Sequence, residues 1–249
     1  MSFVTMRRLT TAAAFLFISA GAAHSARAQS VHDSLGWHLT GNLGYVQTSG
    51  NTKLSTVNLG DKLTFRPNHT LLFTQTAAFI YGYNDSTETA NQTLASLRGD
   101  YFLNARLSVF GLAGYERNPF AGIDQRFEES VGMSFFAVKQ PKNELQVDFG
   151  AGLNQQTNLG VETDFSFARL APRFKHNFTG KAYLEESIEM IENLDDTGDL
   201  RSMSLTSLVA PVTSGIAIRF GYLMRYDAEP VPGFKKLDTT FTSGLQLTF

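Results

Sequence analysis

Apolar and polar residues alternate with a period of two along most of this chain. The C-terminal segment shows the pattern well, because Phe241, Leu245 and Phe249 fall on one face and Thr242 and Gln246 on the other. Such alternation is typical of β-strands that have one apolar face. Beyond the N-terminal segment, no stretch is apolar enough for a membrane-spanning helix, so the pattern predicts an all-β protein.

Twelve segments carry this alternation, and most are close to the ~9–11 residues that a tilted strand needs to cross a bilayer. They span 35–47, 53–65, 70–83, 92–103, 106–117, 125–138, 144–154, 164–175, 182–192, 201–210, 215–227 and 238–249.

The connections between these segments alternate between two kinds. Short ones carry turn residues such as Pro, Asn and Gly, and they fall at 66–69, 104–105, 140–143, 177–180 and 211–214. The others are mostly longer and more polar or acidic, at 48–52, 84–91, 118–124, 155–163, 193–200 and 228–237. A meander of this kind places all short turns at one end and all long loops at the other. We therefore predict a closed, antiparallel, up-and-down transmembrane β-barrel of about twelve strands, since closure removes unpaired edges.

Aromatic residues gather at both predicted membrane boundaries, as amphipathic rings at headgroup depth would. The turn-end set is Trp37, Phe65, Phe73, Tyr101, Phe102 and Phe249, and the loop-end set is Tyr45, Tyr81, Tyr83, Tyr115, Phe127 and Tyr226. A soluble sandwich or lipocalin-like barrel also alternates, with its apolar face turned inward. The terminal Phe249 favours the membrane barrel, because it resembles the C-terminal signal read by the outer-membrane barrel assembly machinery. That machinery is a predicted partner.

The N-terminal segment is predicted to be a signal peptide, residues 1–28, that leaves a mature barrel of residues 29–249. Arg7 and Arg8 precede an apolar run, and Ala26-Arg27-Ala28 supplies a small-x-small cleavage site. The formal net charge of the chain is −2, and cleavage removes three arginines and no acid. A mildly acidic chain without a basic run is a poor nucleic-acid binder. The predicted location is the bacterial outer membrane, with both termini periplasmic and lipid and lipopolysaccharide as surroundings.

Two stretches carry a resemblance to a known family. They are Thr48-Ser49-Gly50-Asn51-Thr52 and the run from Tyr115 to Arg126, Tyr-Glu-Arg-Asn-Pro-Phe-Ala-Gly-Ile-Asp-Gln-Arg. Together they resemble the salt-induced outer membrane protein family, otherwise described as a domain of unknown function. The resemblance implies an outer-membrane barrel of a Gram-negative bacterium and a link to salt stress, and it supplies no catalytic or binding residues.

If the large apolar residues face lipid, the barrel interior receives charges of both signs. These pore-lining candidates are Arg219, Arg225, Glu185, Glu189, Glu128 and Asp148. Opposite charges can pair into a plug or line a narrow polar channel, and both interpretations stay open. The same alternation places Asp61 among lipid-facing residues, which indicates either a bulge or misplaced strand ends.

The third predicted loop carries Asp124 and Arg126 in one motif. An ion pair between them, or a carboxylate that caps backbone, is the favoured interpretation. The alternative is a contact between Arg117 or Arg126 and a ligand or lipopolysaccharide phosphate.

We predict a non-enzymatic barrel, either a narrow channel for small solutes or ions or an envelope-structural protein. The alternative is a barrel-embedded hydrolase acting on lipid or lipopolysaccharide, which would use a histidine as general base. His38, His69 and His176 all map to the turn end, away from outer-leaflet substrates. No cofactor and no metal are predicted, because the acidic fifth loop, which could bind Ca²⁺, is more typical of a solvated surface.

Overall fold

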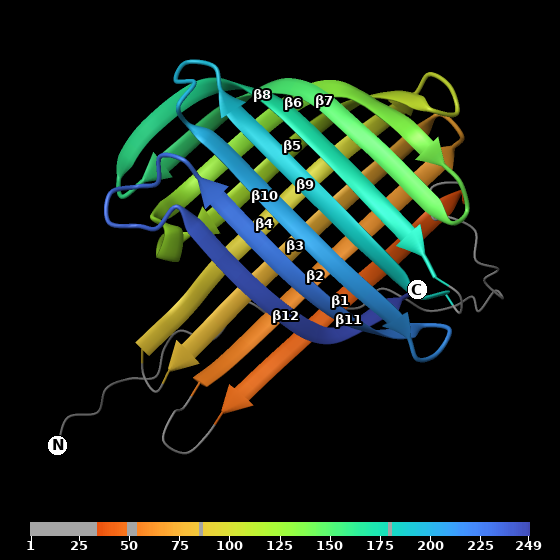
Figure 1. The fold of residues 1–249 in the computed structure, drawn as a ribbon, viewed down its shortest axis with the longest axis horizontal. Coiled ribbons are helices and arrows are strands. Elements are labelled where there is room, and N and C mark those ends of the chain that lie inside the picture. The colour runs from red at the N-terminus through yellow and green to blue at the C-terminus, as the bar shows by residue number, and fades with distance from the viewer. Residues whose placement is uncertain (1–33, 49–53, 85–86, 179–180) are drawn as a thin grey trace.

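In the computed structural model, twelve antiparallel strands form one closed ring within residues 34–48, 54–84, 87–178 and 181–249, the part of the chain that the structure describes (Figure 1). The predicted signal peptide and the Ser49-Gly50-Asn51 motif lie outside the described residues. The strands are β1 (Gly36–Thr48), β2 (Leu54–Asn68), β3 (Leu71–Asn84), β4 (Thr87–Phe102), β5 (Leu107–Asn118), β6 (Ile123–Lys139), β7 (Asn143–Asn158), β8 (Val161–Asn177), β9 (Tyr183–Asn193), β10 (Leu200–Pro211), β11 (Ile216–Asp227) and β12 (Leu237–Thr248).

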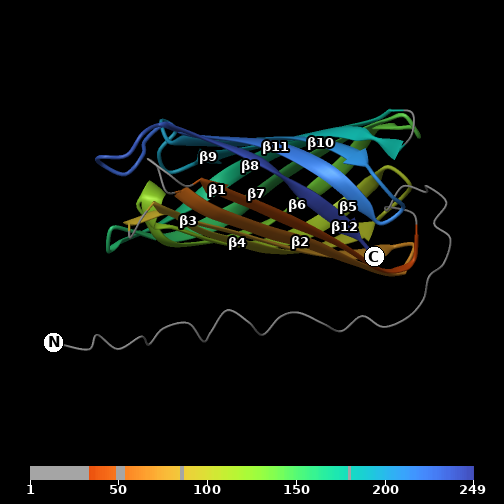
Figure 2. The ribbon, with the colours of Figure 1, turned by 90° about the horizontal axis from the view of Figure 1, so that it is seen from below.

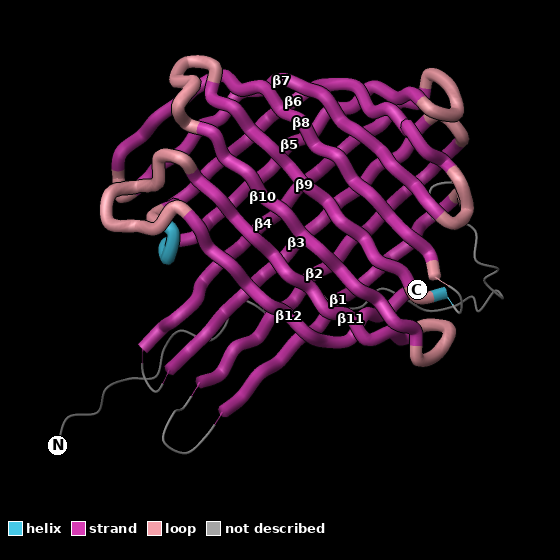
Figure 3. The backbone as a smooth tube through the Cα atoms, viewed as in Figure 1, coloured by secondary structure: helices cyan, strands magenta, loops and turns pink. Residues whose placement is uncertain are grey.

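Each strand pairs with its neighbours in the sequence, and β1 pairs with β12 to close the ring (Figure 3). The closing register joins Thr40–Leu43 to Leu245–Thr248, and the amide of Phe249 donates to the Leu39 carbonyl at 3.0 Å. Gly244 permits the close approach at this seam, since a Cβ there would lie 2.2 Å from the carbonyl oxygen of Leu43. The predicted fold class is confirmed.

Two of the predicted long loops are wrong. β4 begins at Thr87, so most of 84–91 is strand, and β7 and β8 are joined by Leu159 and Gly160 alone. These two residues have φ of 49° and 78°, which suits the twist of a tight hairpin. The polar residues at the loop end of β4, β7 and β8 still form backbone hydrogen bonds with the neighbouring strands, because a polar side chain does not prevent strand pairing. The connection after β5 is a short 3₁₀ turn, η1 (Pro119–Ala121), closed by Gly122.

Large apolar side chains point away from the barrel axis. On β11, the outward residues from Ile216 to Tyr226 are each 38–43% exposed, whereas the inward Ala217 and Gly221 are buried. A soluble barrel has the opposite arrangement, so this one presents the surface that a lipid bilayer covers. Among the described residues, no helix is long and apolar enough to span a membrane, a finding that says nothing of a β-barrel.

Most aromatic residues predicted at the boundaries lie on this outer surface. Trp37 stacks on Phe65 with ring centroids 4.1 Å apart, and Tyr115 packs against Phe127 at 5.0 Å. Phe102 was predicted to join the turn-end set, and that prediction is wrong. Its ring faces the interior, with the Arg66 guanidinium 4.9 Å from the ring centroid. Phe102 lies two and four residues after Asp100 and Arg98 on β4, so its side chain falls on the same, inward face of the strand.

Asp61 lies on the outer face at the middle of β2, because the pairing with β1 and β3 runs without a shift from Leu54 to Phe65. Neither a bulge at Asp61 nor a wrong strand boundary therefore resolves the conflict seen in the sequence. The carboxylate accepts a hydrogen bond from the Gln75 side chain on β3. Its other cross-strand neighbours are Gly41 and Ala77, which leave it uncovered.

The interior is filled unevenly. Phe110, Phe136 and Phe167 are 4%, 1% and 1% exposed, and they project inward from β5, β6 and β8. The Phe110 ring packs onto Gly132, where a Cβ would lie 2.8 Å from Phe110 Cζ and 2.1 Å from the Phe149 carbonyl oxygen. The walls on either side of the barrel are seen from below in Figure 2, with β2, β3 and β4 opposite β8 to β11.

The packing at Gly132 predicts that one added methyl group destabilises the barrel. We expect Gly132→Ala to lower the free energy of unfolding by about 1–3 kcal/mol, because the Cβ meets backbone that cannot move aside. The measurement is urea unfolding in phospholipid vesicles, followed by the fluorescence of Trp37, the single tryptophan. The matched control is Gly111→Ala on the neighbouring strand, where nothing lies within 4 Å of the added Cβ. Equal stability of the two variants would contradict this account.

Candidate functional site in the barrel lumen

One cavity of about 1410 Å³ occupies the barrel lumen. Its lining includes His38, Phe102 and Gln140 at the turn end. The same cavity is lined by Ala121 and Lys236 at the loop end. Within the part of the chain that the structure describes, the lumen is therefore continuous from one end of the barrel to the other.

The lumen is more basic than the protein as a whole. Thirteen lysines and arginines line the cavity against nine aspartates and glutamates, although the formal net charge of the chain is −2. One of the nine acids, Asp61, borders the cavity while its side chain lies on the outer face. The basic residues are Lys62, Arg98, Arg126, Lys139, Arg169, Arg173, Lys175, Lys181, Arg201, Arg219, Arg225, Lys235 and Lys236. Most basic side chains of the barrel therefore lie inside it, and many of the acidic side chains lie on the loops and the outer face.

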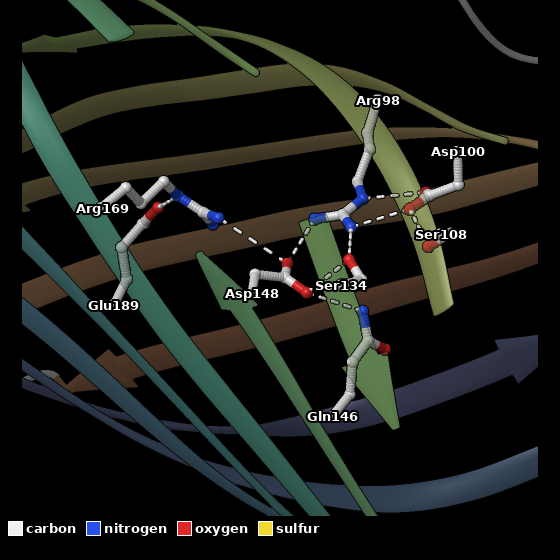
Figure 4. Close-up of polar contacts among 8 residues, drawn as sticks. All are labelled: Arg98, Asp100, Ser108, Ser134, Gln146, Asp148, Arg169 and Glu189. Carbon is white, nitrogen blue, oxygen red and sulfur yellow. Dashed lines mark hydrogen bonds and ion pairs between the residues drawn. The ribbon is translucent and has the colours of Figure 1, made fainter. Parts of the chain in front are cut away.

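A polar network covers the inner surface of the β4–β9 wall (Figure 4). Its centre is Asp148, whose carboxylate lies 2.5 Å from Arg98 Nη1 and 3.6 Å from Arg169 Nη1. Ser134 and Gln146 donate to the same carboxylate at 2.6 and 2.9 Å. Asp148 has only 2% of its side chain exposed, so these donors replace the water it has lost.

The network continues on both sides of Asp148. Arg98 donates to both oxygens of Asp100 at 2.8 Å, and Arg169 donates through Nε to Glu189 at 2.5 Å. Both guanidinium groups also pack on Phe110, with Cζ 4.1 and 5.7 Å from the ring centroid. The Phe110 ring and the ion pairs stacked on it therefore fill space on the β4–β9 side of the lumen.

Near the loop end, an ion pair crosses the lumen. Glu116 on β5 pairs with Arg225 on β11, and these strands stand six places apart in a ring of twelve. Glu116 also lies 3.2 Å from Arg126 Nη1, and Arg126 donates to Gln156 at 2.9 Å. Above this crossing, a Cβ on Gly122 would lie 2.9 Å from the Phe234 ring, so the loops after β5 and β11 meet. The crossing and the two loops narrow this mouth.

The remaining pore-lining candidates also face inward. Glu128 lies 3.5 Å from Arg201, and Arg219 donates to the Ser207 hydroxyl at 2.9 Å. Glu185 lines the cavity beside Lys175, its cross-strand neighbour on β8. The structure thus brings Asp148 and Glu189 into one network, places Arg225 in the crossing, and leaves Glu185 and Arg219 together toward the turn end.

Asp124 and Arg126 do not pair with each other. Both lie in β6 and not in a loop, and the Asp124 carboxylate accepts from the Gly160 amide at 2.8 Å. This bond caps the tight β7–β8 hairpin next door. Arg126 is two residues further along, but the pairing with β7 shifts between Ile123 and Gln125, and its side chain points into the lumen toward Glu116. The alternative in which it contacts lipopolysaccharide from an external loop does not fit this position.

Sequence reasoning did not single out Arg98, Glu116 or Lys62. Alternation marks each as inward, and Glu116 falls within the Tyr115–Arg126 motif. Their partners lie far along the chain, however, since Arg98 is 50 residues from Asp148 and Glu116 is 109 residues from Arg225. Such pairs follow from the curvature of the closed ring and not from local spacing.

Comparison with family models matches residues 41–249 to DUF481, described as a protein of unknown function. The match covers most of the chain. The chain belongs to the DUF481 family. Comparison of this DUF481 barrel with curated proteins finds no match. The DUF481 assignment supports an outer-membrane barrel of unknown function, while a salt-induced role stays a prediction.

Solved structures similar to this DUF481 chain are barrels. The NanC porin superposes with a TM-score of 0.52 at 11% identity, covering 84% of this chain and 98% of that one. The translocator domain of the autotransporter NalP from Neisseria meningitidis gives 0.44 at 14% identity, covering 88% and 90%. The KdgM porin gives 0.43 at 8% identity, covering 85% and 99%. The similarity to the NanC porin shows a shared fold.

The central place of Asp148 predicts a large loss of stability when its charge is removed. We expect Asp148→Asn to lower the free energy of unfolding by about 3–5 kcal/mol, because Arg98 and Arg169 then share a buried site without their anion. Urea unfolding in vesicles measures the change. The control is Glu128→Gln. Glu128 lies 3.5 Å from Arg201 and is partly exposed, so the loss of its charge should lower the free energy of unfolding less. A DUF481 barrel in which Asp148→Asn unfolds like the wild type would show that the network does not hold the wall.

Proposed function

We propose that this DUF481 protein is a narrow channel for small hydrophilic solutes and ions in the bacterial outer membrane. The observation that carries the proposal is the continuous cavity, which is lined by residues from both ends of the barrel, many of them charged. Charged groups along a pore replace part of the hydration shell of a passing ion.

The pore is narrow for physical reasons. A ring of twelve strands is wider than the filled eight-stranded case and narrower than a sixteen-stranded porin. The Phe110 layer and the Asp148 network occupy part of the cross-section, and the Glu116–Arg225 pair crosses the loop-end mouth. These features favour small solutes over large ones.

The apolar outer surface supports a bilayer location, with outer-membrane lipid and lipopolysaccharide as its surroundings. The first and last strands both have their free ends at the turn end. We place this end in the periplasm, where outer-membrane barrels have their short turns. Phe249, 68% exposed beside the seam, is the residue we assign to recognition by the barrel assembly machinery.

Single-channel recording in a planar bilayer tests the channel. Thr40 lines the lumen on β1, and the next residue back, Leu39, has outward parity. We expect Thr40→Trp to lower the conductance at least about twofold by filling the open side, and Leu39→Trp to leave it unchanged. Equal currents from both variants would mean that ions do not pass through this lumen.

A silent bilayer, with the protein shown to be folded and inserted, would overturn the channel. The crossing at the loop end would then favour a closed envelope-structural barrel, the role in which a link to salt stress fits.

The hydrolase alternative has one observation in its favour, because Ser34 Oγ and His38 Nε2 lie 2.9 Å apart at the turn end. Lipid hydrolysis that is lost in Ser34→Ala would support it.

The ion pair across the loop-end mouth predicts a variant with a larger current. We expect Arg225→Ala to raise the conductance by about half or more, because no ion pair then crosses the lumen. Glu116 still has its ion pair with Arg126, so its charge is not left without a partner. Met224→Ala, which shortens an outward neighbour, is the control and should conduct like the wild type. An unchanged current in Arg225→Ala would show that the narrowest point lies elsewhere.

A further inference from the structure

Four basic side chains in the turn-end half of the lumen form no direct ion pair with a carboxylate. They are Lys62 on β2, Arg173 and Lys175 on β8, and Arg219 on β11. Across the described residues, no carboxylate forms an ion pair with any of them, whereas Arg98, Arg126, Arg169, Arg201 and Arg225 all have such partners. We call these four residues the basic constriction.

The basic constriction joins opposite walls of the barrel. β2 and β8 stand six places apart in the ring of twelve strands, and Lys62 is near enough to interact electrostatically with Arg173, Lys175 and Arg219. The side chain of Lys62 is exposed to the lumen. The cations therefore converge on the space through which a solute would pass.

Two carboxylates in the cavity lining offset only part of this charge. Glu185 interacts electrostatically with Lys62, and Glu144 interacts with Arg173 and Lys175, so two acids stand against four cations. Lys175 lies 4.3 Å from the Tyr183 ring centroid, and Arg219 donates to a neutral hydroxyl, that of Ser207. Like charges held together across a lumen repel one another, and an anion placed between them relieves this repulsion.

The facing wall leaves room for a ligand. Thr40, Thr64 and Thr76 line the cavity beside Lys62, in contrast to the aromatic layer of the β5–β8 wall. Their short side chains also offer hydroxyl groups that can donate hydrogen bonds to an oxyanion.

We propose that the basic constriction is a binding site for small anions that carry two or more carboxylate or phosphate groups, and that it makes the channel anion-selective. This inference rests on the proposed channel and names its solute class. A multivalent anion offers one charged group to Lys62 and another to the β8 cations, whereas a monovalent anion has a single charge for all of them. The Asp148 network lacks this property because its arginines are already matched by acids.

The experiment measures reversal potential in a KCl gradient and block of the KCl current by citrate. Wild-type protein should favour chloride over potassium by at least about threefold, and citrate should reduce its current. The double variant Lys62→Gln/Arg173→Gln should lose most of this preference and bind citrate at least about tenfold more weakly. Lys142→Gln, which removes one positive charge from an exposed turn outside the cavity, is the control and should match the wild type.

Glu185 offers a second matched pair of variants. Glu185→Gln removes one of the two acids beside the constriction, the one that interacts with Lys62, and should increase the preference for chloride. Glu186→Gln changes the next residue, which lies on the outer face and accepts from Ser204 at 2.6 Å, and should leave selectivity unchanged.

The outcomes separate this inference from the channel itself. Discrete current steps with cation preference, or with selectivity equal in the wild type and the double variant, would overturn the anion site and leave the channel. If no current flows, calorimetric titration of the detergent-folded protein with citrate decides the site. Citrate binding that is weakened in the double variant and kept in Lys142→Gln supports the site. No binding, or equal binding in all three proteins, overturns it.

Discussion

Backbone hydrogen bonding across a closed ring is the constraint on which this structure depends. Hydrocarbon offers no partner to an N–H or C=O group, so each strand must find its partners on both sides. The ring closes where β1 meets β12, through a short register from Thr40 to Leu43 and the bond between Leu39 and Phe249. The two ends of the described chain therefore complete the sheet together, and every other strand keeps the order of the sequence.

Closure gives each side chain one of two environments. Outward residues meet lipid, so Ile, Phe, Tyr and Met occupy them on β11, and inward residues meet the lumen. Two of the outward acids have a polar partner on the adjacent strand. Glu186 accepts from Ser204 and Thr206, and Asp61 accepts from Gln75. These bonds lower the cost of an acid that faces hydrocarbon.

The two walls of the lumen differ in how they are filled and in how their charges are paired, and this difference creates the proposed anion site. One wall carries Phe110 with the Asp148 network stacked on it, so its charges are paired and its space is filled. The opposite wall carries threonines and Lys62, so its space stays open and its charge is not matched. Because the acids of the lumen are largely used in the network and in the loop-end crossing, the surplus that remains is basic. A protein with a negative formal charge thereby acquires a basic passage.

The twelve strands, their meander, the closed barrel and the alternation of side chains along each strand could all be predicted from the sequence. These follow from a period-two pattern and from turn residues, both of which act over neighbouring positions. On the condition that the apolar face meets lipid, alternation predicted Glu128, Asp148 and Arg219 inside. Residue type was a poorer guide than alternation. Phe102 was assigned to the outer surface because it is aromatic, although its alternation is that of inward residues. Segments 84–91 and 155–163 were assigned to loops because they are polar, although they continue the strands.

The tertiary structure alone decided which face is inside, which charges meet and which remain unmatched. Alternation is identical for a soluble and a membrane barrel, and only the closed ring shows the apolar face outward. The pairing of Glu116 with Arg225, and the approach of Lys62 to β8, join strands on opposite walls. Such approaches depend on ring curvature, strand tilt and side-chain length together, and no spacing along the chain encodes them.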